Sequence, residues 1–434
     1  MISRLSVLVI GLLLSMAVAA IPQIERWSTA SGAQVLYVHT PEIPMVDIRV
    51  IFDAGSARDG KKGGIAAMTN GLLSTGTGLL GEEAIAETMD RLGVNLGFDS
   101  LRDMAVVSLR SLSDDHILDP ALEVMADVIH HPSFPKSAFE RERSRQLIGI
   151  QAQKQSPGTI AEKALFRAMY GTHPYAEPSS GTEKSVKALK RSDLRRFHAQ
   201  YYVGSNAVIA IVGDVGREQA KKIAERVVGS IPMGERAPKL PDAVTAKPGD
   251  TIRVDYPSVQ SHLLMGHPVL RRGDPDYFDL YVGNHILGGS GLVSKISEEV
   301  REERGLAYSA YSYFAPMAGE GPYKAGLQTK NESRDEALEV LRKTIVDFIE
   351  QGPGIEELIR SKKNITGGFP LRIDSNKKII DYLGMIGFYG LPDDYLDTFN
   401  QNVEAVTSES IKNAFRHRLH PSEMVTVIVG GKPD

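Results

Sequence analysis

Apolar and polar residues alternate along several short stretches of the chain, with a period near two that predicts β-strands. Longer segments separate these stretches, and in them apolar residues recur every three to four positions, as in amphipathic helices. In the N-terminal half, the expected strands are residues 34–40, 47–53, 94–99, 104–110 and 206–213. The expected helices are residues 63–75, 82–92, 116–131, 135–154, 159–170, 191–201 and 216–227. This mixture favours an α+β fold, in which a mainly antiparallel sheet is packed with helices on one face.

The second half of the chain repeats the pattern of the first. Residues 194–215, LRRFHAQYYVGSNAVIAIVGDV, resemble residues 411–432, IKNAFRHRLHPSEMVTVIVGGK. The expected strands here are 251–256, 261–267, 306–314, 321–328 and 423–430, and the expected helices are 274–287, 292–303, 333–350, 354–371, 375–388 and 407–418. A repeat of this length indicates a duplicated domain. We therefore expect two homologous domains, residues 21–231 and 251–434, joined by a proline-rich linker over residues 232–250.

The first residues follow a different pattern from the rest of the chain. Arg4 precedes an apolar run over residues 5–16, and Ala17-Val18-Ala19 has the small-x-small spacing of a cleavage site. This pattern predicts a cleavable signal peptide over residues 1–20, and an uncleaved anchor is the alternative. No later stretch is long and apolar enough to predict stable membrane insertion. We expect a periplasmic protein.

Composition excludes several classes of function. The net charge is −4 with no Lys/Arg stripe, so no nucleic-acid partner is expected. The chain has no cysteine, which excludes disulfides, thiolate metal sites and cysteine nucleophiles. None of the eleven histidines forms an HxxxH or HExxH motif. The basic stretch 185–196 is interpreted as a solvated helix face.

Residues 298–314, EEVREERGLAYSAYSYF, join a charged helix to a strand, with Gly305 at the helix end. Strand alternation predicts that Tyr308, Ala310 and Ser312 share one face, opposite Tyr311 and Tyr313. Taken alone, Arg301 fits a surface ion pair and Tyr308 fits an ordinary sheet residue. The preceding run Gly288-Gly289-Ser290-Gly291 fits a flexible turn between two helices.

Thr69-Asn70-Gly71 stands in the middle of the expected first helix, where a glycine costs roughly 1 kcal/mol relative to alanine. This stretch and four others resemble, in order, the pitrilysin/insulinase family of inverted zinc peptidases, in the short form similar to mitochondrial processing peptidase. The resemblance covers roughly residues 25–432. The five stretches are DAGSARDGKKGGIAAMTNGLLSTGT, GTHPYAEPSSGTEKSVKAL, RRFHAQYYVGSNAVIAIVGDV, ILGGSGLVSKISEEVREERGLAYSAYSYF and GFPLRIDSNKKIIDYLGMIGFYGLP.

The resemblance implies that a zinc site has been lost. The family signature H-x-x-E-H supplies two zinc ligands and a general base, and a glutamate on a later helix is the third ligand. The matching positions in this chain are Ala67, Asn70, Gly71 and Gly149. None of these residues can act as the corresponding ligand or base, so the resemblance implies that this chain binds no metal.

The resemblance also implies a role for the chain without zinc. In two-chain members of the family, a zinc-free subunit supplies an Arg–Tyr pair, and the matching residues are Arg301 and Tyr308, in R-x-x-x-G-L-x-Y spacing. The turn Gly288–Gly291 matches a region implicated in substrate binding. The expected function is a non-catalytic, substrate-binding subunit of a heterodimeric zinc metallopeptidase, inactive alone. It would pair with a homologous HxxEH-bearing chain that holds the zinc, and it would bind unfolded peptide. The alternatives are an inert scaffold or peptide-binding protein of the same fold, and an active peptidase with an unseen site.

Overall fold

The computed structural model describes residues 23–431, so the expected signal peptide lies outside the described residues. The described part of the N-terminal half, from residue 23, contains six strands: β1 (Glu25–Ser28), β2 (Gln34–His39), β3 (Met45–Phe52), β4 (Asn95–Ser100), β5 (Ala105–Leu112) and β6 (Ala207–Gly213). Its helices are α1 (Ile65–Gly71), α2 (Glu82–Leu92), α3 (Asp115–His130), α4 (Lys136–Gln153), α5 (Pro157–Tyr170), α6 (Glu183–Ala188), α7 (Arg191–Tyr201) and α8 (Arg217–Ala224). Strand β1 was not expected from the sequence, and α6 was expected only as part of the basic helix face over residues 185–196.

The C-terminal half, as far as residue 431, contains five strands: β7 (Thr251–Val254), β8 (Gln260–Leu270), β9 (Ala307–Phe314), β10 (Gly321–Lys330) and β11 (Val425–Val429). Its helices are α9 (Tyr277–Asn284), α10 (Lys295–Ser297), α11 (Arg334–Gln351), α12 (Ile355–Gly368), α13 (Asn376–Tyr389), α14 (Tyr395–Ala405) and α15 (Ser408–Arg418). Three short helices adjoin α9 and α10, namely η6 (His285–Gly289), η7 (Gly291–Val293) and η8 (Glu298–Glu302). The helix expected over residues 292–303 is interrupted at Ser294 and continues from α10 directly into η8, and α14 was not expected.

The two sheets have the same topology, which confirms the α+β duplication. The first has the order β1-β2-β6-β3-β5-β4 and the second β7-β11-β8-β10-β9. Without β1, each position in the first sheet has a counterpart in the second. In both, the pair at the same end of this order is parallel, β2 with β6 and β7 with β11, and the other neighbours are antiparallel. Strands β4 and β9 occupy equivalent edges.

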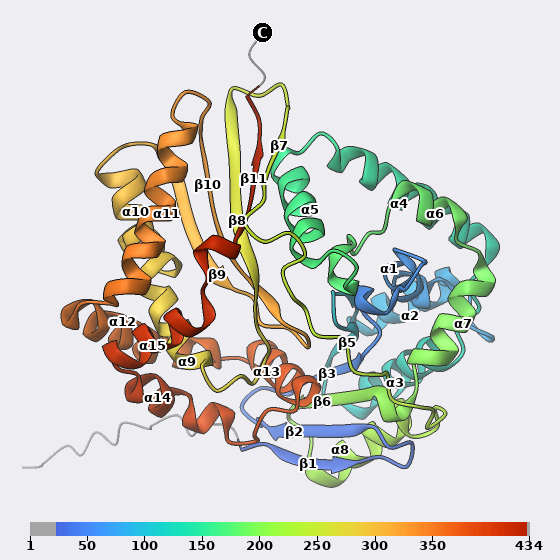
Figure 1. Cartoon of the computed structure of the whole chain (residues 1–434). Coiled ribbons are helices and arrows are strands. Elements are labelled where there is room, and N and C mark those ends of the chain that lie inside the picture. Colours follow the sequence, from blue (N-terminus) through green and yellow to red (C-terminus); the bar gives the residue numbers. More distant parts are fainter. Residues whose placement is uncertain (1–22, 432–434) are drawn as a thin grey trace, which may run out of the picture.

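Each half covers one face of its sheet with its own helices and lends one helix to the other half (Figure 1). Helix α13 packs on β6 and β3 of the first sheet. An added Cβ at Gly387 would lie 2.5 Å from Val208 and 2.6 Å from Leu36, so this glycine permits the close approach. Helix α5 packs on β8 and β11 of the second sheet, where Leu165 and Met169 share an apolar cluster with β11. The two halves are interlocked.

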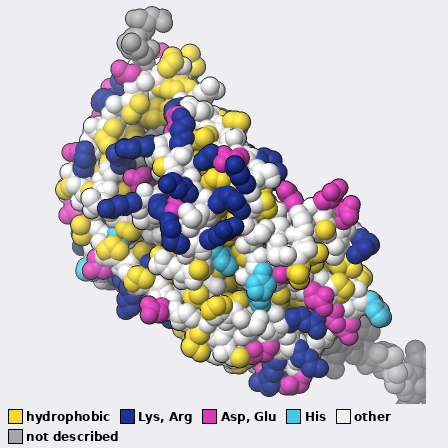
Figure 2. Space-filling model, turned by 90° about the vertical axis from the view of Figure 1, so that its right-hand side faces the viewer, with side chains coloured by type: hydrophobic (Ala, Val, Ile, Leu, Met, Phe, Trp, Pro, Cys, Tyr) yellow, Lys and Arg dark blue, Asp and Glu magenta, His cyan; other side chains and the backbone are white. Residues whose placement is uncertain are grey.

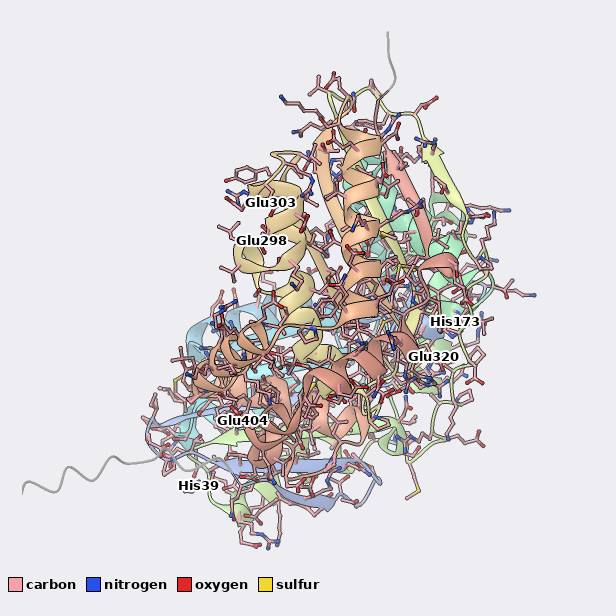
Figure 3. The ribbon with its side chains drawn as sticks, turned by 60° about the vertical axis from the view of Figure 1, so that its left-hand side comes forward. His39, His173, Glu298, Glu303, Glu320 and Glu404 are labelled. Carbon is pink, nitrogen blue, oxygen red and sulfur yellow. The ribbon has the colours of Figure 1, made fainter. Side chains whose placement is uncertain are left out.

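The segment expected as a linker, residues 232–250, forms no helix or strand in the structure and touches both halves. The Nδ1 atom of His173 accepts a hydrogen bond from the Tyr175 amide, and its Nε2 donates to the carbonyl of Pro241 at 3.0 Å. On the other side, the Ala243 amide donates to Glu320 at 2.8 Å. Figure 3 labels His173 and Glu320 close to one another beside this segment.

A buried carboxylate adds a polar connection between the halves. Asp103, in the β4–β5 turn, accepts hydrogen bonds from the hydroxyl of Tyr175 at 2.5 Å, the amide of Ala318 at 2.8 Å and the hydroxyl of Tyr389 at 3.1 Å. Tyr389 is the last residue of α13. The same helix is thus fixed by apolar packing along its length and by hydrogen bonding at its end.

A basic surface covers α4, α6 and α7, where Figure 2 shows Lys and Arg side chains gathered. Many of them pair with carboxylates. Glu183 pairs with Lys154 and Lys187, and Asp193 pairs with Lys62 and Arg196. This surface agrees with the solvated helix face expected for residues 185–196. No helix over residues 23–431 combines the length and the apolar composition that a membrane crossing requires.

Candidate functional site

Helix α1 begins on a buried carboxylate. Asp59 accepts hydrogen bonds from the amides of Gly64 at 2.6 Å and Ala66 at 2.9 Å, which supplies partners to two amides at the helix start. Burial raises the pKa of Asp59 to about 7, although the two backbone hydrogen bonds act in the opposite direction. The first turn of α1 therefore depends on an acid that titrates near neutral pH.

The side chain of Asn70 is buried and hydrogen-bonded in the interior of the first half. Its side chain is 1% exposed. The Nδ2 group donates to the carbonyl of Asp99 at 2.9 Å, and Oδ1 accepts from the hydroxyl of Tyr202 at 3.2 Å. These bonds connect α1 to the end of β4 and to the residue after α7. Asn70 is thus a structural residue that joins three elements.

The other three positions matched to metal ligands adjoin open space. Ala67 and Gly71 are half-buried on α1, and Gly149 is exposed on α4. An added Cβ at Gly71 or Gly149 would meet no atom within 4 Å. Side chains could be accommodated at these positions, but a methyl group and two hydrogens provide no ligand atom.

The residues present do not fit a zinc ion. Zinc requires nitrogen, sulfur or carboxylate oxygen donors, usually three from the protein in a catalytic site. Over residues 23–431, no group of three or more His, Cys, Asp or Glu side chains is arranged to hold a metal. The one polar side chain among the four positions, Asn70, is already hydrogen-bonded. We therefore derive no metal chemistry for this chain.

Arg301 and Tyr308 lie together at the start of the edge strand β9. The guanidinium carbon of Arg301 is 5.1 Å from the centroid of the Tyr308 ring, a cation–π distance. Gly305 ends the preceding turn with a φ of +62°, a conformation that favours glycine. The Arg301 Nε lies 3.4 Å from a carboxylate oxygen of Glu302. The turn at Gly305 folds the chain back, so that the two side chains meet.

The face predicted for Tyr308 is wrong. The pairing register between β9 and β10 shifts between Gln328 and Thr329, and Tyr308 has no partner on β10. This bulge reverses the alternation, so Ala310 and Ser312 are buried whereas Tyr308 is 85% exposed. Within the described residues, its hydroxyl has no hydrogen-bond partner, which leaves it available to an external group.

Two further tyrosines extend this exposed surface along β9. Tyr311 and Tyr313 are 39% and 38% exposed, and their rings stack with centroids 5.9 Å apart. The sequence indicated an aromatic cluster but placed it behind Tyr308. Because of the bulge, all three tyrosines are accessible on the same edge strand.

The turn Gly288–Gly291 packs against the middle of β9. A Cβ at Gly288 would lie 2.5 Å from the amide nitrogen of Ser312, so only glycine fits there. Asn284 stabilises the contact, because its Nδ2 donates to the carbonyl of Ser312 at 2.9 Å and its Oδ1 accepts from the Ser312 hydroxyl at 2.7 Å. Gly289 and Ser290 line a pocket of about 560 Å³. Gly288 therefore has a packing role, while Gly289 and Ser290 reach a cavity.

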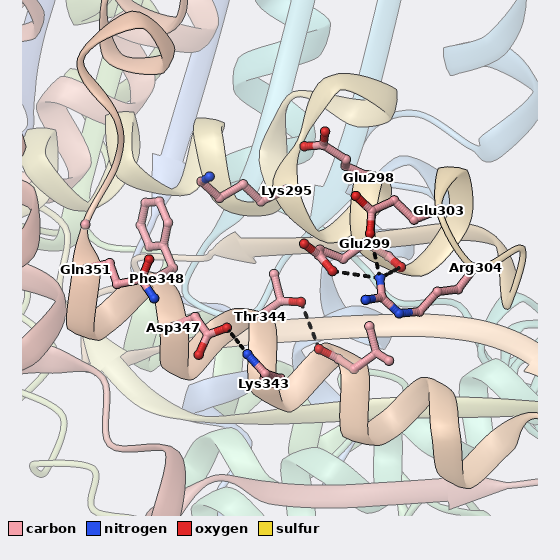
Figure 4. A pocket seen from close by; sticks show the side chains of 12 residues that line it. Lys295, Glu298, Glu299, Glu303, Arg304, Lys343, Thr344, Asp347, Phe348 and Gln351 are labelled. Carbon is pink, nitrogen blue, oxygen red and sulfur yellow. Dashed lines mark hydrogen bonds and ion pairs between the residues drawn. The ribbon is translucent and has the colours of Figure 1, made fainter.

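A second pocket, of about 350 Å³, separates the η8 turn from α11 (Figure 4). Its charged side chains are mostly paired. Arg304 bonds to Glu299 at 2.7 Å and to Glu303 at 3.0 Å, and Lys343 pairs with Asp347. Glu298 and Glu303 are carried by the same turn, as Figure 3 also shows. The charged side chains of this pocket are mostly satisfied by ion pairs within the η8 turn and within α11.

The structure does not bring the positions matched to the zinc site close to Arg301 and Tyr308. Helix α1, which carries Ala67, Asn70 and Gly71, lies on the opposite side of the molecule from α10, which precedes Arg301 (Figure 1). One chain therefore presents two separate places: on the first half, four matched positions without metal-ligating atoms, and on the second, an Arg–Tyr pair in which Tyr308 is exposed and Arg301 is half-buried.

This duplicated fold, with a donor-free first helix, defines a class of zinc-peptidase-like chains that lack the metal ligands. Family profiles agree with that description. Residues 34–183 match the family described as "Insulinase (Peptidase family M16)", and residues 188–365 match "Peptidase M16 inactive domain". A crystal structure of a peptidase M16 inactive domain from Pseudomonas fluorescens is 38% identical, with a TM-score of 0.91, covering 94% of this chain and 98% of that one. The chain belongs to the peptidase M16 family.

Two named relatives span nearly the whole chain. "Uncharacterized zinc protease YmxG" of Bacillus subtilis is 26% identical over 391 residues, which is 88% of this chain and 94% of the relative. "Non-peptidase homolog YmxG" of Helicobacter pylori is 24% identical over 403 residues, 92% of each. The two relatives carry names of opposite meaning, so the ligand positions of this chain itself have to decide its chemistry.

Proposed function

We propose that this chain is the non-catalytic subunit of a two-chain zinc peptidase and that it supplies Arg301 and Tyr308 to the zinc site of a homologous HxxEH-bearing partner. The observation that carries the proposal is the convergence of half-buried Arg301 with exposed Tyr308, on a chain whose own metal positions lack ligands. A guanidinium that donates to a peptide carbonyl, beside a phenol that donates to a developing oxyanion, suits amide hydrolysis. The zinc chemistry itself belongs to the partner.

The arrangement of the chain supports action on a partner rather than within itself. Helix α10, which precedes Arg301, lies on the opposite side of the molecule from α1, which carries three of this chain's own vacated positions. Tyr308 stands on an edge strand whose outer side forms no ladder within the described residues. An unfolded peptide can be bound there by strand addition. The turn Gly288–Gly291 supports this strand from behind and contributes to the same substrate surface.

The proposal includes export to the periplasm, which rests on the pattern of residues 1–20. The competing function is an inert scaffold or peptide-binding protein of the same fold. A scaffold or peptide-binding protein would not require Arg301 or Tyr308 for catalysis. Hydrolysis data therefore separate the two.

The test is hydrolysis of a fluorogenic unstructured peptide by the mature chain alone, by a homologous HxxEH-bearing chain alone, and by the two mixed. We expect no turnover by this chain and a chelator-sensitive rate for the mixture well above that of the partner alone. A mixture no faster than the partner would refute the proposal and favour the scaffold. Metal-dependent turnover by this chain alone would refute the loss of its site.

A further inference from the structure

A pocket of about 310 Å³ lies where the end of β9 meets α9 and the segment after α12, and we call it the two-arginine pocket. Its lining includes Arg272 and Arg372 and the rings of Tyr277, Tyr281, Tyr313 and Phe314. No aspartate or glutamate is among the residues that line it. The positive charge of the two guanidinium groups is therefore not balanced by any carboxylate in the lining of the pocket.

Arg272 lacks an anionic partner within the described residues. Its guanidinium carbon lies 5.6 Å from the Tyr277 ring centroid and 5.7 Å from that of Tyr389, and its buried Nε has no hydrogen-bond partner. The adjacent residue, Arg271, is fully paired with Glu320 and Asp242. A half-buried guanidinium held between two rings but left without an acceptor is prepared to bind an anion.

Arg372 is the second cation. Its Nη1 donates to the hydroxyl of Tyr281 at 2.8 Å, and it pairs with no carboxylate within the described residues. Two other polar side chains of the pocket are already engaged. Asn284 is bonded to Ser312, and His285 contacts Ser361 at 2.9 Å and Asn364 at 3.2 Å. The two arginines are therefore the groups that remain for a ligand.

The walls of the pocket suit the apolar part of a ligand. The rings of Tyr277 and Tyr281 stack with an interplanar angle of 8° and centroids 5.8 Å apart. Phe314 and Tyr313 enclose the strand side. A ligand with a carboxylate next to an apolar or aromatic group would suit both the two arginines and the aromatic walls of the pocket.

The pocket and the Arg–Tyr pair are connected by one strand. Tyr313 lines the pocket, and Tyr308 lies five positions earlier on β9, with the exposed Tyr311 between them. At about 3.3 Å per residue, the two ends are roughly 16 Å apart, the length of about five residues of extended peptide.

We propose that the two-arginine pocket binds a carboxylate of a peptide, either its C-terminal group or an acidic side chain, about five residues from the bond presented to Arg301 and Tyr308. This inference deepens the proposed function, and it rests on that function for the peptide nature of the ligand. The pocket selects the substrate class and sets the distance between the anchored carboxylate and the reacting bond.

The test is fluorescence anisotropy of labelled, unstructured ten-residue peptides with the full mature chain and no partner. Three peptides share one neutral sequence: one has a free C-terminus, one is amidated, and one is amidated with a single internal Glu. We expect at least tenfold tighter binding of one or both carboxylate-bearing peptides than of the neutral amide. A preference for the free C-terminus identifies the terminal group, and a preference for the Glu peptide identifies a side chain.

The variants Arg372→Gln and Arg272→Gln should each lower the affinity for the preferred peptide by about tenfold and leave the neutral amide unaffected. Arg91→Gln, an exposed arginine on α2, is the matched control and should retain the preference. Circular dichroism verifies folding, and Arg372→Gln decides the matter if Arg272→Gln does not fold.

Equal binding of all three peptides, binding of none, or a preference that survives Arg372→Gln would overturn the inference. None of these outcomes depends on hydrolysis, so the proposed function is judged separately. The variant Arg301→Ala should keep the carboxylate preference, because it leaves the pocket intact.

Discussion

The hydroxyl of Tyr202 donates a hydrogen bond to Oδ1 of Asn70 at 3.2 Å, in a site where Asn70 is 1% exposed. Tyr202 immediately follows α7, so this bond ties that helix to α1. Asn70, the position that the resemblance matches to the family's general base, acts in this structure as a structural connector. The replacement of an acid by its amide keeps a polar contact without placing a charge in the interior.

Asn70→Ala should lower the free energy of unfolding by about 1–3 kcal/mol, because it leaves the Tyr202 hydroxyl and the Asp99 carbonyl without their buried partner. Urea denaturation measures this change. Asn70→Asp tests the charge separately, and it should destabilise the chain more at pH 8 than at pH 5. An Asn70→Ala variant as stable as the parent would show that the hydrogen bonds contribute little.

A zinc site should be recoverable, because side chains at Gly71 and Gly149 meet no atom within 4 Å. Ala67→His with Gly71→His places two imidazoles one turn apart on α1. Addition of Gly149→Glu should tighten zinc binding at least tenfold in competition with a chromophoric chelator. The parent chain is the control. If the glutamate adds no affinity, the match of Gly149 to the third ligand is wrong.

Loss of the Tyr308 hydroxyl should slow the mixed two-chain reaction. We expect Tyr308→Phe or Arg301→Ala to reduce kcat/KM by about 10²–10³, the typical effect of removing one oxyanion donor. Because Tyr308 is 85% exposed, the phenylalanine variant should keep the stability of the parent. Tyr201→Phe, in the first half, is the matched control. Unchanged rates in both variants would remove the Arg–Tyr pair from the proposal and support the scaffold.

Stability should depend on pH through Asp59. Its folded-state pKa of about 7 is above the value near 4 of an unfolded aspartate, so between these values the folded chain keeps a proton that the unfolded chain releases. Its contribution is therefore greatest below about pH 4 and is lost as the pH rises toward 7, at up to about 1.4 kcal/mol per unit. Urea midpoints at pH 5 and pH 7.5 should differ less for Asp59→Asn than for the parent. An unchanged difference would exclude Asp59 as its source.

Two glycines of the turn Gly288–Gly291 should respond differently to alanine. Gly288→Ala would force a Cβ to 2.5 Å from the Ser312 amide nitrogen and should cost about 1–3 kcal/mol or more. Gly291 has a φ of +67° and open space around it, so Gly291→Ala should cost about 1 kcal/mol. Thermal unfolding compares the two. If the turn binds substrate, Gly291→Ala should also weaken peptide binding, although the variant remains folded.

The secondary structure was largely predictable because most strands and helices carry clear periods of two and 3.6. The position of Tyr308 was not, because alternation assumes a regular ladder and the bulge arises from pairing with β10. That Ala67 and Gly71 carry no metal-ligating atom is readable from residue identity, whereas the engagement of Asn70 depends on Tyr202, distant in sequence. Arg272 and Arg372 carry no sequence signal, since an arginine without a carboxylate partner is recognisable only when its surroundings are known.

The exchange of α5 and α13 has a mechanical consequence. Each of these helices seals the apolar side of a sheet that belongs to the other half, so the halves cannot swing apart without wetting both surfaces. A single cut within residues 232–250 should therefore leave two fragments that stay associated and melt in one transition. We therefore expect the two halves to move as one rigid body, so that in the proposed two-chain assembly any opening that admits a peptide would occur between the chains.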